Sequence, residues 1–326
     1  MDYRPRIVRK NIKEKVFLLS NISSKEYIYR QFKEKGIAQL IKIDEPLNKH
    51  TSYHIGGPAD FYCIPEKIDD LKSLISIATR EKIPFHIIGN GTNLLIYDKG
   101  VRGLVIKLGK DFKKVSFFGR MLKTGAGISM INLSKIAFSK NLSGLEFACN
   151  IPGSLGGAII SNASFNGYSI SEIIKSVTVL TESNKIKKIS QSDLHFGYRK
   201  CKLKTTAAII LGAEIVLNPA SGKAIKSKME KNIRIRKNNQ PLKHFSAGSI
   251  FKNPENYFAG ALIEQVGAKG LSCGNAEVSS VHANFIINKG NALASDILFL
   301  IEEIELKVFK RFGIKMEREI EIIGEK

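Results

Sequence analysis

The pattern of apolar and polar positions differs between the start of the chain and the rest. Residues 1–45 are basic, and Ser24–Phe32 has a helical periodicity, so this segment predicts one or two basic helices. A polar stretch, Glu45–Ser52, follows and is interpreted as a linker. From about residue 59, short apolar runs alternate with an amphipathic pattern, which is typical of a βαβ unit.

Two α/β regions are predicted after the linker. Residues 46–109 contain a helix at Asp69–Lys82 and strands at Asp60–Ile64, Phe85–Ile88 and Leu104–Leu108. Residues 110–222 contain a helix at Ile131–Lys140 and strands at Val115–Phe118, Leu122–Thr124, Ser176–Thr181, Lys185–Ile189 and Ala208–Leu217. The tract Asn218–Gly222 has helix-breaking and flexible residues, so we set a boundary there.

The last third, residues 223–326, predicts two helices and a closing strand. A basic helix covers Lys223–Lys237, and a longer amphipathic helix covers Ser295–Phe312. We expect Ser295 to cap this second helix and Gly313 to end it. Alternation at Glu317–Ile323 predicts the strand.

Composition and cysteine usage exclude several classes. Hydrophobic residues make up 43% of the chain, but the longest apolar runs, such as Ala207–Leu211, fall far short of the ~20 residues that span a bilayer. The N-terminus lacks the apolar core of a secretory signal, so we expect a cytoplasmic protein. The four cysteines are widely spaced, and His50 and His54 lie in a glycine-flanked extended stretch. We predict reduced thiols and no metal site.

The formal net charge of +21 raises the possibility of nucleic-acid binding. The charge is spread along nearly the whole chain, however, and no recognisable nucleic-acid module is present. Residues 1–35 and 223–243 are locally enriched, and the second stretch suits an anionic small substrate equally well. We therefore expect no specific nucleic-acid partner.

The glycine loops carry the strongest functional signal. In Pro84–Leu95 an apolar strand runs into Gly89 and Gly91, where backbone amides can face a phosphate, with Thr92 and Asn93 as added donors. Similar clusters occur at Ile55–Asp60, Gly125–Gly127 and Ile151–Ala158. Each alone is more often only a structural turn, but together they could converge on an extended dinucleotide.

Three residues could carry chemistry. Ser249 follows a glycine on a turn of small residues without the flanking pattern of a hydrolase nucleophile, so it suits a proton donor, or merely stabilises the turn. Arg199 could hold a carboxylate or enolate, or form a surface ion pair. Glu319 shares a strand face with Glu317 and Glu321, which usually indicates solvent exposure. A cationic approach suited to a diphosphate is formed by Arg234, Arg236, Lys237 and Gln240.

Taken in order, these tracts resemble the UDP-N-acetylenolpyruvoylglucosamine reductase family from about residue 45 to the end of the chain. The resemblance is carried by Ile55–Ala59, Gly89–Leu95, Ile151–Ala158, Phe196–Arg199, Gln240–Pro241, Ala247–Pro254, Val281–Ile286 and Arg318–Glu325. It implies an α+β fold: a two-subdomain FAD-binding fold of the vanillyl-alcohol-oxidase type, residues 46–109 and 110–222, and a C-terminal α+β substrate domain, residues 223–326. The basic segment 1–45 would precede them.

The resemblance also assigns roles. FAD would contact Gly56, Gly57, Gly89, Asn90, Gly91, Thr92, Asn93, Leu94, Gly125, Gly127, Ile151, Pro152, Gly153, Ser154, Gly156 and Gly157. NADPH would supply hydride through flavin to the enolpyruvyl UDP-sugar, a peptidoglycan precursor. Ser249 would protonate C2, and Arg199 and Glu319 would stabilise or relay protons to the enol. Lys237, Gln240 and Asn253 would hold the substrate, and we expect a monomer.

The chain departs from the family pattern at three positions. Asn166 stands where a tyrosine is common, Ser164 replaces a glycine, and Glu321 replaces a basic residue. The short interval between Gln240–Pro241 and Ala247 resembles the subtype without a substrate lid.

Two other functions stay open. One is a related FAD oxidase that uses oxygen, against which Arg199, Ser249 and Glu319 together argue. The other is a phosphate- or nucleic-acid-binding protein with residues 1–35 as an arm.

Overall fold

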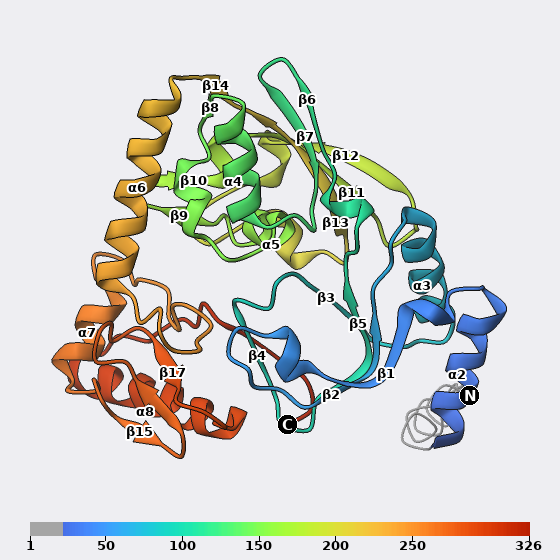
Figure 1. The fold of residues 1–326 in the computed structure, drawn as a ribbon. Coiled ribbons are helices and arrows are strands. Elements are labelled where there is room, and N and C mark those ends of the chain that lie inside the picture. The colour runs from blue at the N-terminus through green and yellow to red at the C-terminus, as the bar shows by residue number, and fades with distance from the viewer. Residues whose placement is uncertain (1–21) are drawn as a thin grey trace, which may run out of the picture.

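The computed structural model describes residues 22–326, and the first predicted region forms a mixed sheet with two helices beside it (Figure 1). The strand order is β1 (Ile41–Pro46), β2 (Pro58–Cys63), β5 (Val101–Lys107) and β3 (Phe85–Ile88). β1 is antiparallel to β2, whereas β2 and β3 are both parallel to β5. The helices are α2 (Ile22–Glu34) and α3 (Ile68–Arg80), with short 3-10 turns at Ala38–Leu40 and Leu47–His50.

The predicted linker at Glu45–Ser52 is wrong at its start. Glu45 lies in β1 opposite Ala59, and the residues after Pro46 form the 3-10 turn Leu47–His50. β1 is an edge strand with most of its residues exposed. An edge strand can carry polar residues on its solvent face, so the polar sequence did not indicate pairing.

The second region is an antiparallel sheet of five strands, with its helices packed around it. The strand order is β12 (Ile186–Ser190), β11 (Ile174–Leu180), β13 (Ile209–Val216), β7 (Met121–Gly125) and β6 (Val115–Phe118). The helices are α4 (Met130–Ser139) and α5 (Leu155–Ile160). The 3-10 turns are η3 (Asp111–Lys113), η4 (Glu146–Asn150), η5 (Ile170–Glu172), η6 (Ser192–Leu194) and η7 (Lys202–Thr205). Two short antiparallel pairs of strands complete the region: β8 (Leu142–Ser143) with β14 (Asn218–Pro219), and β9 (Ser164–Phe165) with β10 (Tyr168–Ser169).

The helix α6 (Gly222–Asn239) runs from this second region to the C-terminal region, as Figure 1 shows. There the helices α7 (Ala259–Gln265) and α8 (Ala294–Phe312) lie with a small sheet of β15 (Ser272–Cys273), β16 (Ala276–Val278) and β17 (Ile286–Asn288). The chain then returns to the first region, where β18 (Glu321–Ile323) pairs in parallel with β4 (Leu94–Ile96).

The long helix α8 ends where the sequence predicted but begins differently. Gly313 is its C-cap with φ 70°, which confirms the predicted stop. The predicted cap at Ser295 is wrong, because the helix begins at Ala294 after Leu293. The Asp98 carboxylate accepts hydrogen bonds from the amides of Ala294 at 2.9 Å and Ser295 at 3.3 Å. This cap comes from almost two hundred residues away, and Asp296 adds a local one by accepting from the Leu293 amide at 3.0 Å.

The predicted final strand is also shorter than expected. Only Glu321–Ile323 pairs with β4, whereas the preceding residues bond to the C-terminal region. The Lys252 amide donates to the Glu317 carbonyl at 2.8 Å, and the Glu319 amide donates to the Ile250 carbonyl at 2.7 Å. This segment therefore joins two regions at the point where Glu319 lies.

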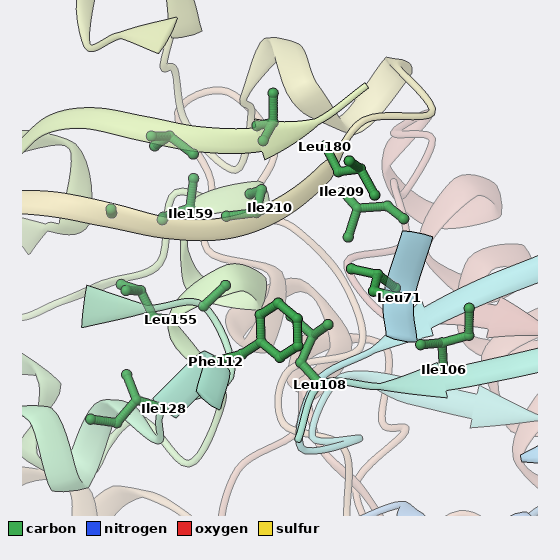
Figure 2. Packing of buried hydrophobic residues seen from close by; sticks show 14 of the residues in the cluster. Leu71, Ile106, Leu108, Phe112, Ile128, Leu155, Ile159, Leu180, Ile209 and Ile210 are labelled. Atoms are coloured by element: carbon green, nitrogen blue, oxygen red, sulfur yellow. The ribbon is translucent and has the colours of Figure 1, made fainter. Parts of the chain in front are cut away.

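Buried apolar residues form one core across the first two regions. Figure 2 shows Leu71 of the first region near Ile209 of the second, and Leu108 of the first near Phe112 of the second. A separate core holds the C-terminal region together and includes Tyr53, Ile55 and Leu95 from the first region. The Tyr53 hydroxyl donates to the Ile286 carbonyl at 3.0 Å, so this contact fastens the C-terminal region to the start of the fold.

The described part of the chain contains neither a membrane-spanning helix nor a cluster of metal-ligating side chains. None of its helices is both long and apolar enough to cross a bilayer. Within residues 22–326 there is also no group of three or more His, Cys, Asp or Glu side chains arranged to hold a metal ion.

Candidate functional site

A large cavity of about 1090 Å³ lies where the three regions meet, and most of the predicted site residues line it. Its wall contains Arg199 from the second region, Ser249 from the C-terminal region, and Glu319 from the returning segment. The structure thus brings the three predicted catalytic residues to one cavity although the sequence separates them by 50 to 120 positions.

The loop between β3 and β4 forms one wall and depends on its glycines. Gly91 has φ 66°, and a Cβ there would lie 2.0 Å from the His50 carbonyl oxygen. The Ser52 amide donates to the Gly91 carbonyl at 3.0 Å, and the Ser52 hydroxyl donates to the Ser246 carbonyl at 2.7 Å. Only glycine fits both the backbone angle and the close approach.

A second loop, before α5, packs directly against the first. A Cβ on Gly89 would lie 2.3 Å from Ser154 Oγ, the hydroxyl that caps α5. The Asn90 side-chain amide donates to the Pro152 carbonyl at 2.8 Å. The two glycine loops therefore form one continuous surface.

This surface fits an extended dinucleotide. The backbone amides of Asn90, Gly91 and Thr92 donate to no acceptor within residues 22–326, so they remain available to an anionic ligand. The cavity volume lies just above the roughly 300–1,000 Å³ typical of ligand sites. A ligand as long as a flavin dinucleotide needs this combination of length and backbone donors.

Three of the predicted cofactor residues lie behind the cavity rather than on its wall. A Cβ on Gly57 would lie 2.1 Å from the Asp98 carbonyl oxygen, and one on Gly125 would lie 2.1 Å from that of Phe112. Gly56 packs against Ile96 in the same manner. These glycines allow close backbone packing. The predicted residues on the wall are Gly89, Asn90, Gly91, Thr92, Asn93, Leu94, Gly127, Ile151, Pro152, Gly153, Ser154, Gly156 and Gly157.

Arg199 and Glu319 form a partly buried ion pair. Arg199 Nε lies 2.6 Å from Glu319 Oε1, and Arg199 Nη1 donates to the Ser164 hydroxyl at 2.9 Å. The contact brings the two charged groups together as an ion pair. Arg199 has φ 53°, an uncommon backbone conformation that the surrounding contacts must hold.

Burial raises the pKa of the Glu319 carboxyl above its ordinary value, and the Arg199 charge opposes that effect only in part. Glu319 therefore keeps its proton to a higher pH than an exposed glutamate. Its backbone carbonyl oxygen accepts a hydrogen bond from the Asn93 side chain at 3.0 Å, which ties the acid to the loop between β3 and β4.

Ser249 lies on the cavity wall next to the loop between β3 and β4. The preceding Gly248 has φ 79°, and its Cβ position faces the Thr92 carbonyl at 4.0 Å. In the described part of the chain the Ser249 hydroxyl has no hydrogen-bond partner. Buried apolar residues Ile250 and Phe251 follow it and anchor the turn. The hydroxyl is available to a ligand in the cavity.

The acids of the returning segment are each paired with a base, and Glu317, whose side chain is 69% exposed, also faces solvent as expected. Glu319 pairs with Arg199 as described. Glu321 Oε1 lies 2.7 Å from Lys204 Nζ, and Glu317 contacts Lys252. Glu317, Glu319 and Glu321, which the sequence placed on one strand face, therefore form three acid–base pairs. The central pair, Arg199 with Glu319, is the most buried.

The predicted substrate residues occupy different places. Gln240 lines the cavity and accepts a hydrogen bond from Arg236 Nε at 2.7 Å, and Arg236 lines it too. Burial lowers the pKa of the Arg236 guanidinium. Lys237 is exposed and lies off the wall. Asn253 lies with Tyr198 in a smaller adjoining pocket of about 580 Å³. There the backbone amide of Asn253 donates to the tyrosine hydroxyl at 3.2 Å.

Sequence reasoning gave no role to several wall residues. Lys107 follows Ile106 at the end of β5, and burial lowers the pKa of its ammonium group. Lys204 and Ser52 also line the cavity. Lys107, Lys204 and Ser52 are each isolated polar residues in the sequence and belong to no recognisable motif. Their sequence neighbourhoods gave no signal that could have found them.

Two of the departures from the family pattern have visible contacts. The Ser164 hydroxyl accepts from Arg199, so the serine adds a partner to the guanidinium. Asn166 has φ 52°, and its amide donates to Asn232 Oδ1 at 3.1 Å, which joins β9–β10 to α6.

A cavity with these glycine loops, beside a buried acid, a guanidinium and a free hydroxyl, defines the class as a flavin-dependent oxidoreductase. In agreement, residues 59–190 match the family described as an FAD binding domain. Residues 240–323 match the C-terminal domain of UDP-N-acetylenolpyruvoylglucosamine reductase. The chain belongs to the UDP-N-acetylenolpyruvoylglucosamine reductase family.

Close relatives span nearly the whole chain. A UDP-N-acetylenolpyruvoylglucosamine reductase of Caldanaerobacter subterraneus subsp. tengcongensis is 45% identical over 87% of this chain and 94% of its own length. One of Clostridioides difficile is 41% identical over 87% and 94%. The crystal structure of the enzyme from Thermus caldophilus superposes with a TM-score of 0.76 at 33% identity, covering 86% of this chain and 99% of that one. The expected α+β fold with an FAD-binding portion and a C-terminal domain is confirmed.

Proposed function

We propose that the protein catalyses the NADPH-dependent, FAD-mediated reduction of UDP-N-acetyl-enolpyruvoylglucosamine to UDP-N-acetylmuramate. The reaction would belong to peptidoglycan precursor synthesis and would be carried out by a monomeric enzyme in the cytoplasm. The observation that supports it best is the meeting of Arg199, Glu319 and Ser249 on the wall that also carries the glycine loops. The oxidase alternative has no use for that combination.

Bound FAD would supply the hydride-transfer chemistry between NADPH and the substrate. The loops Gly89–Leu94 and Ile151–Gly157 would hold it through backbone amides. Hydride addition at C3 of the enolpyruvyl group leaves negative charge delocalised toward its carboxylate. The Arg199 guanidinium is already fixed by Glu319 and Ser164, so it can stabilise this charge without rearrangement. Such a donor typically contributes about 3 kcal/mol.

Protonation at C2 completes the reduction, and Ser249 is the proposed donor. Its hydroxyl has no competing partner among the described residues, which leaves it free to approach the substrate. A serine donates weakly unless the charge left on its oxygen is stabilised. Arg199 would stabilise it, while Glu319, which retains its proton to higher pH than usual, would restore the proton.

The diphosphate of the UDP-sugar would bind near the end of α6. Gln240 and Arg236 lie on the cavity wall there, whereas Lys237 is exposed one residue further on. Asn253 would contact the substrate from the adjoining pocket. Lys237 would then reach only the outer part of the diphosphate.

Replacing Arg236 by methionine should therefore raise KM for the UDP-sugar more than replacing Lys237 by methionine. The expected increase for Arg236→Met is about 10- to 100-fold, equivalent to the roughly 1.5–3 kcal/mol of a hydrogen bond to a charged group. Steady-state kinetics with the UDP-sugar varied gives the comparison. Flavin content should stay unchanged in both variants. A larger effect of Lys237→Met would move the diphosphate out to the cavity mouth.

The visible spectrum of the purified protein tests the proposed function. NADPH added without oxygen should bleach the flavin band near ~450 nm, and the enolpyruvyl UDP-sugar should then restore it. Colour restored only by oxygen would indicate the oxidase. A colourless protein that takes up no added FAD and binds DNA in a salt-sensitive manner would indicate the nucleic-acid-binding alternative.

A further inference from the structure

Two charged residues on the cavity wall have no part in the mechanism above. Lys204 Nζ lies 2.7 Å from Glu321 Oε1, and both side chains line the cavity that contains Arg199 and Glu319. The Lys204 and Glu321 side chains are 41% and 43% exposed, against 19% and 18% for Arg199 and Glu319. This outer pair thus stands beside the more buried inner pair, on the solvent side of the wall.

The backbone fixes the two pairs relative to each other. The Asn93 side chain donates to the Glu319 carbonyl, and the Asn93 carbonyl accepts from the Glu321 amide, both at 3.0 Å. One residue of the cofactor loop therefore holds both acids. The two cations likewise come from one segment, since Lys204 lies in η7, five residues after Arg199. The backbones that carry the two pairs are therefore linked on both the acid side and the base side.

The charge around Glu319 is closely balanced. The cations that face it are Arg199, Lys204 and Lys252, and each lowers the pKa of its carboxyl against the larger opposing effect of burial. The acids on the same segment are Glu317 and Glu321. Lys252 and Lys204 are each partnered by one of these acids. Removing a single member of the outer pair would leave the charge of its partner without compensation near a partly buried carboxyl, and because the pair is only half-exposed, solvent screens that charge in part.

We propose that Lys204 and Glu321 act as a positioning pair that controls whether Glu319 carries its proton when the substrate is reduced. This inference rests on the proposed function and deepens it, because it assigns the charge state of the proton-restoring group to two residues that do not touch the reacting atoms. Loss of the lysine charge disfavours ionised Glu319. Loss of the Glu321 charge favours it.

The test uses four flavin-loaded proteins: the unchanged chain, Lys204→Gln, Glu321→Gln and the double variant. Stopped-flow measurement gives the pH dependence of flavin reoxidation by the enolpyruvyl UDP-sugar. A second readout, independent of turnover, is the pH titration of the infrared carboxyl band that Glu319→Gln removes in each background. Lys202→Gln serves as the matched control, because Lys202 lies in the same 3-10 turn, is exposed, and makes no ion pair with the described residues.

The midpoint that Glu319 contributes should move to higher pH in Lys204→Gln and to lower pH in Glu321→Gln. The double variant should return close to the unchanged protein, and Lys202→Gln should match it. A merely structural role would lower the rate in both single variants without opposite shifts, and such a result would overturn the inference. Coincident midpoints in all proteins would overturn it too.

Failure of the proposed function would show differently. If the UDP-sugar did not reoxidise the flavin of the unchanged protein, the proposed reaction would be excluded. The infrared titration would still report the proton affinity of Glu319 in each variant. Normal reoxidation combined with unshifted carboxyl titrations would exclude only the role of the pair.

Discussion

Replacing Ser249 by alanine is expected to abolish product formation and to leave flavin reduction by NADPH close to normal. The hydroxyl is the proposed proton donor to C2, and general acid catalysis of this kind contributes about 10²- to 10⁴-fold. Flavin reduction needs no proton from Ser249. Rapid-mixing experiments separate the two half-reactions, so the loss should be confined to reoxidation by the UDP-sugar.

A matched control lies three residues earlier on the same loop. The Ser246 side-chain hydroxyl makes no hydrogen bond with the described residues, and only its backbone carbonyl is used, by Ser52. Ser246→Ala should therefore keep both half-reactions. An equal loss of both half-reactions in Ser249→Ala would contradict the proton-donor role and would point instead to a disturbed cofactor loop.

Replacing Gly91 by alanine is expected to give a protein that no longer retains FAD. The new Cβ would lie 2.0 Å from the His50 carbonyl oxygen, so the loop must move as a whole. The backbone at φ 66° adds a further cost of about 1–2 kcal/mol for a residue with a Cβ. Absorbance of the purified variant gives its flavin content, and equilibrium dialysis with added FAD gives the dissociation constant.

Gly270→Ala is the control for Gly91→Ala, because it introduces the same strain of positive φ without the clash with a neighbouring carbonyl. Gly270 has φ 76°, close to that of Gly91, but no atom lies within 4 Å of its Cβ position, and it is remote from the cavity wall. This control should lose some thermal stability and keep its flavin. Retention of flavin by Gly91→Ala would show that the loop can shift without loss of the binding surface.

Local signals in the sequence were sufficient for most of the longer helices and strands but not for the short strands or for long-range partners. Gly313 ends α8 as predicted, because a glycine at positive φ is a local requirement. The start of α8 was mispredicted, because its cap comes from Asp98. β18 was predicted too long, because Glu317–Ile320 bonds to a segment around Ile250 that no local pattern reveals.

The same limit applies to the site. Ordered motifs indicated that Arg199, Ser249 and Glu319 act together, and all three line one cavity. The sequence could not show which of two adjacent cations faces inward. Arg236 and Lys237 differ by one step of about 100° around α6, and only the packing of that helix turns Arg236 toward the cavity.

The cavity wall is assembled from parts of the chain that lie far apart. Ser52 reaches Ser246, and Asn93 reaches Glu319, across 194 and 226 residues. Closing such loops costs chain entropy, which a ligand touching both sides helps to offset. At a free concentration 100 times its dissociation constant, such a ligand stabilises the folded state by about 2.7 kcal/mol. The cellular supply of flavin would thus govern how long each copy of this enzyme escapes proteolysis, as well as how fast it turns over.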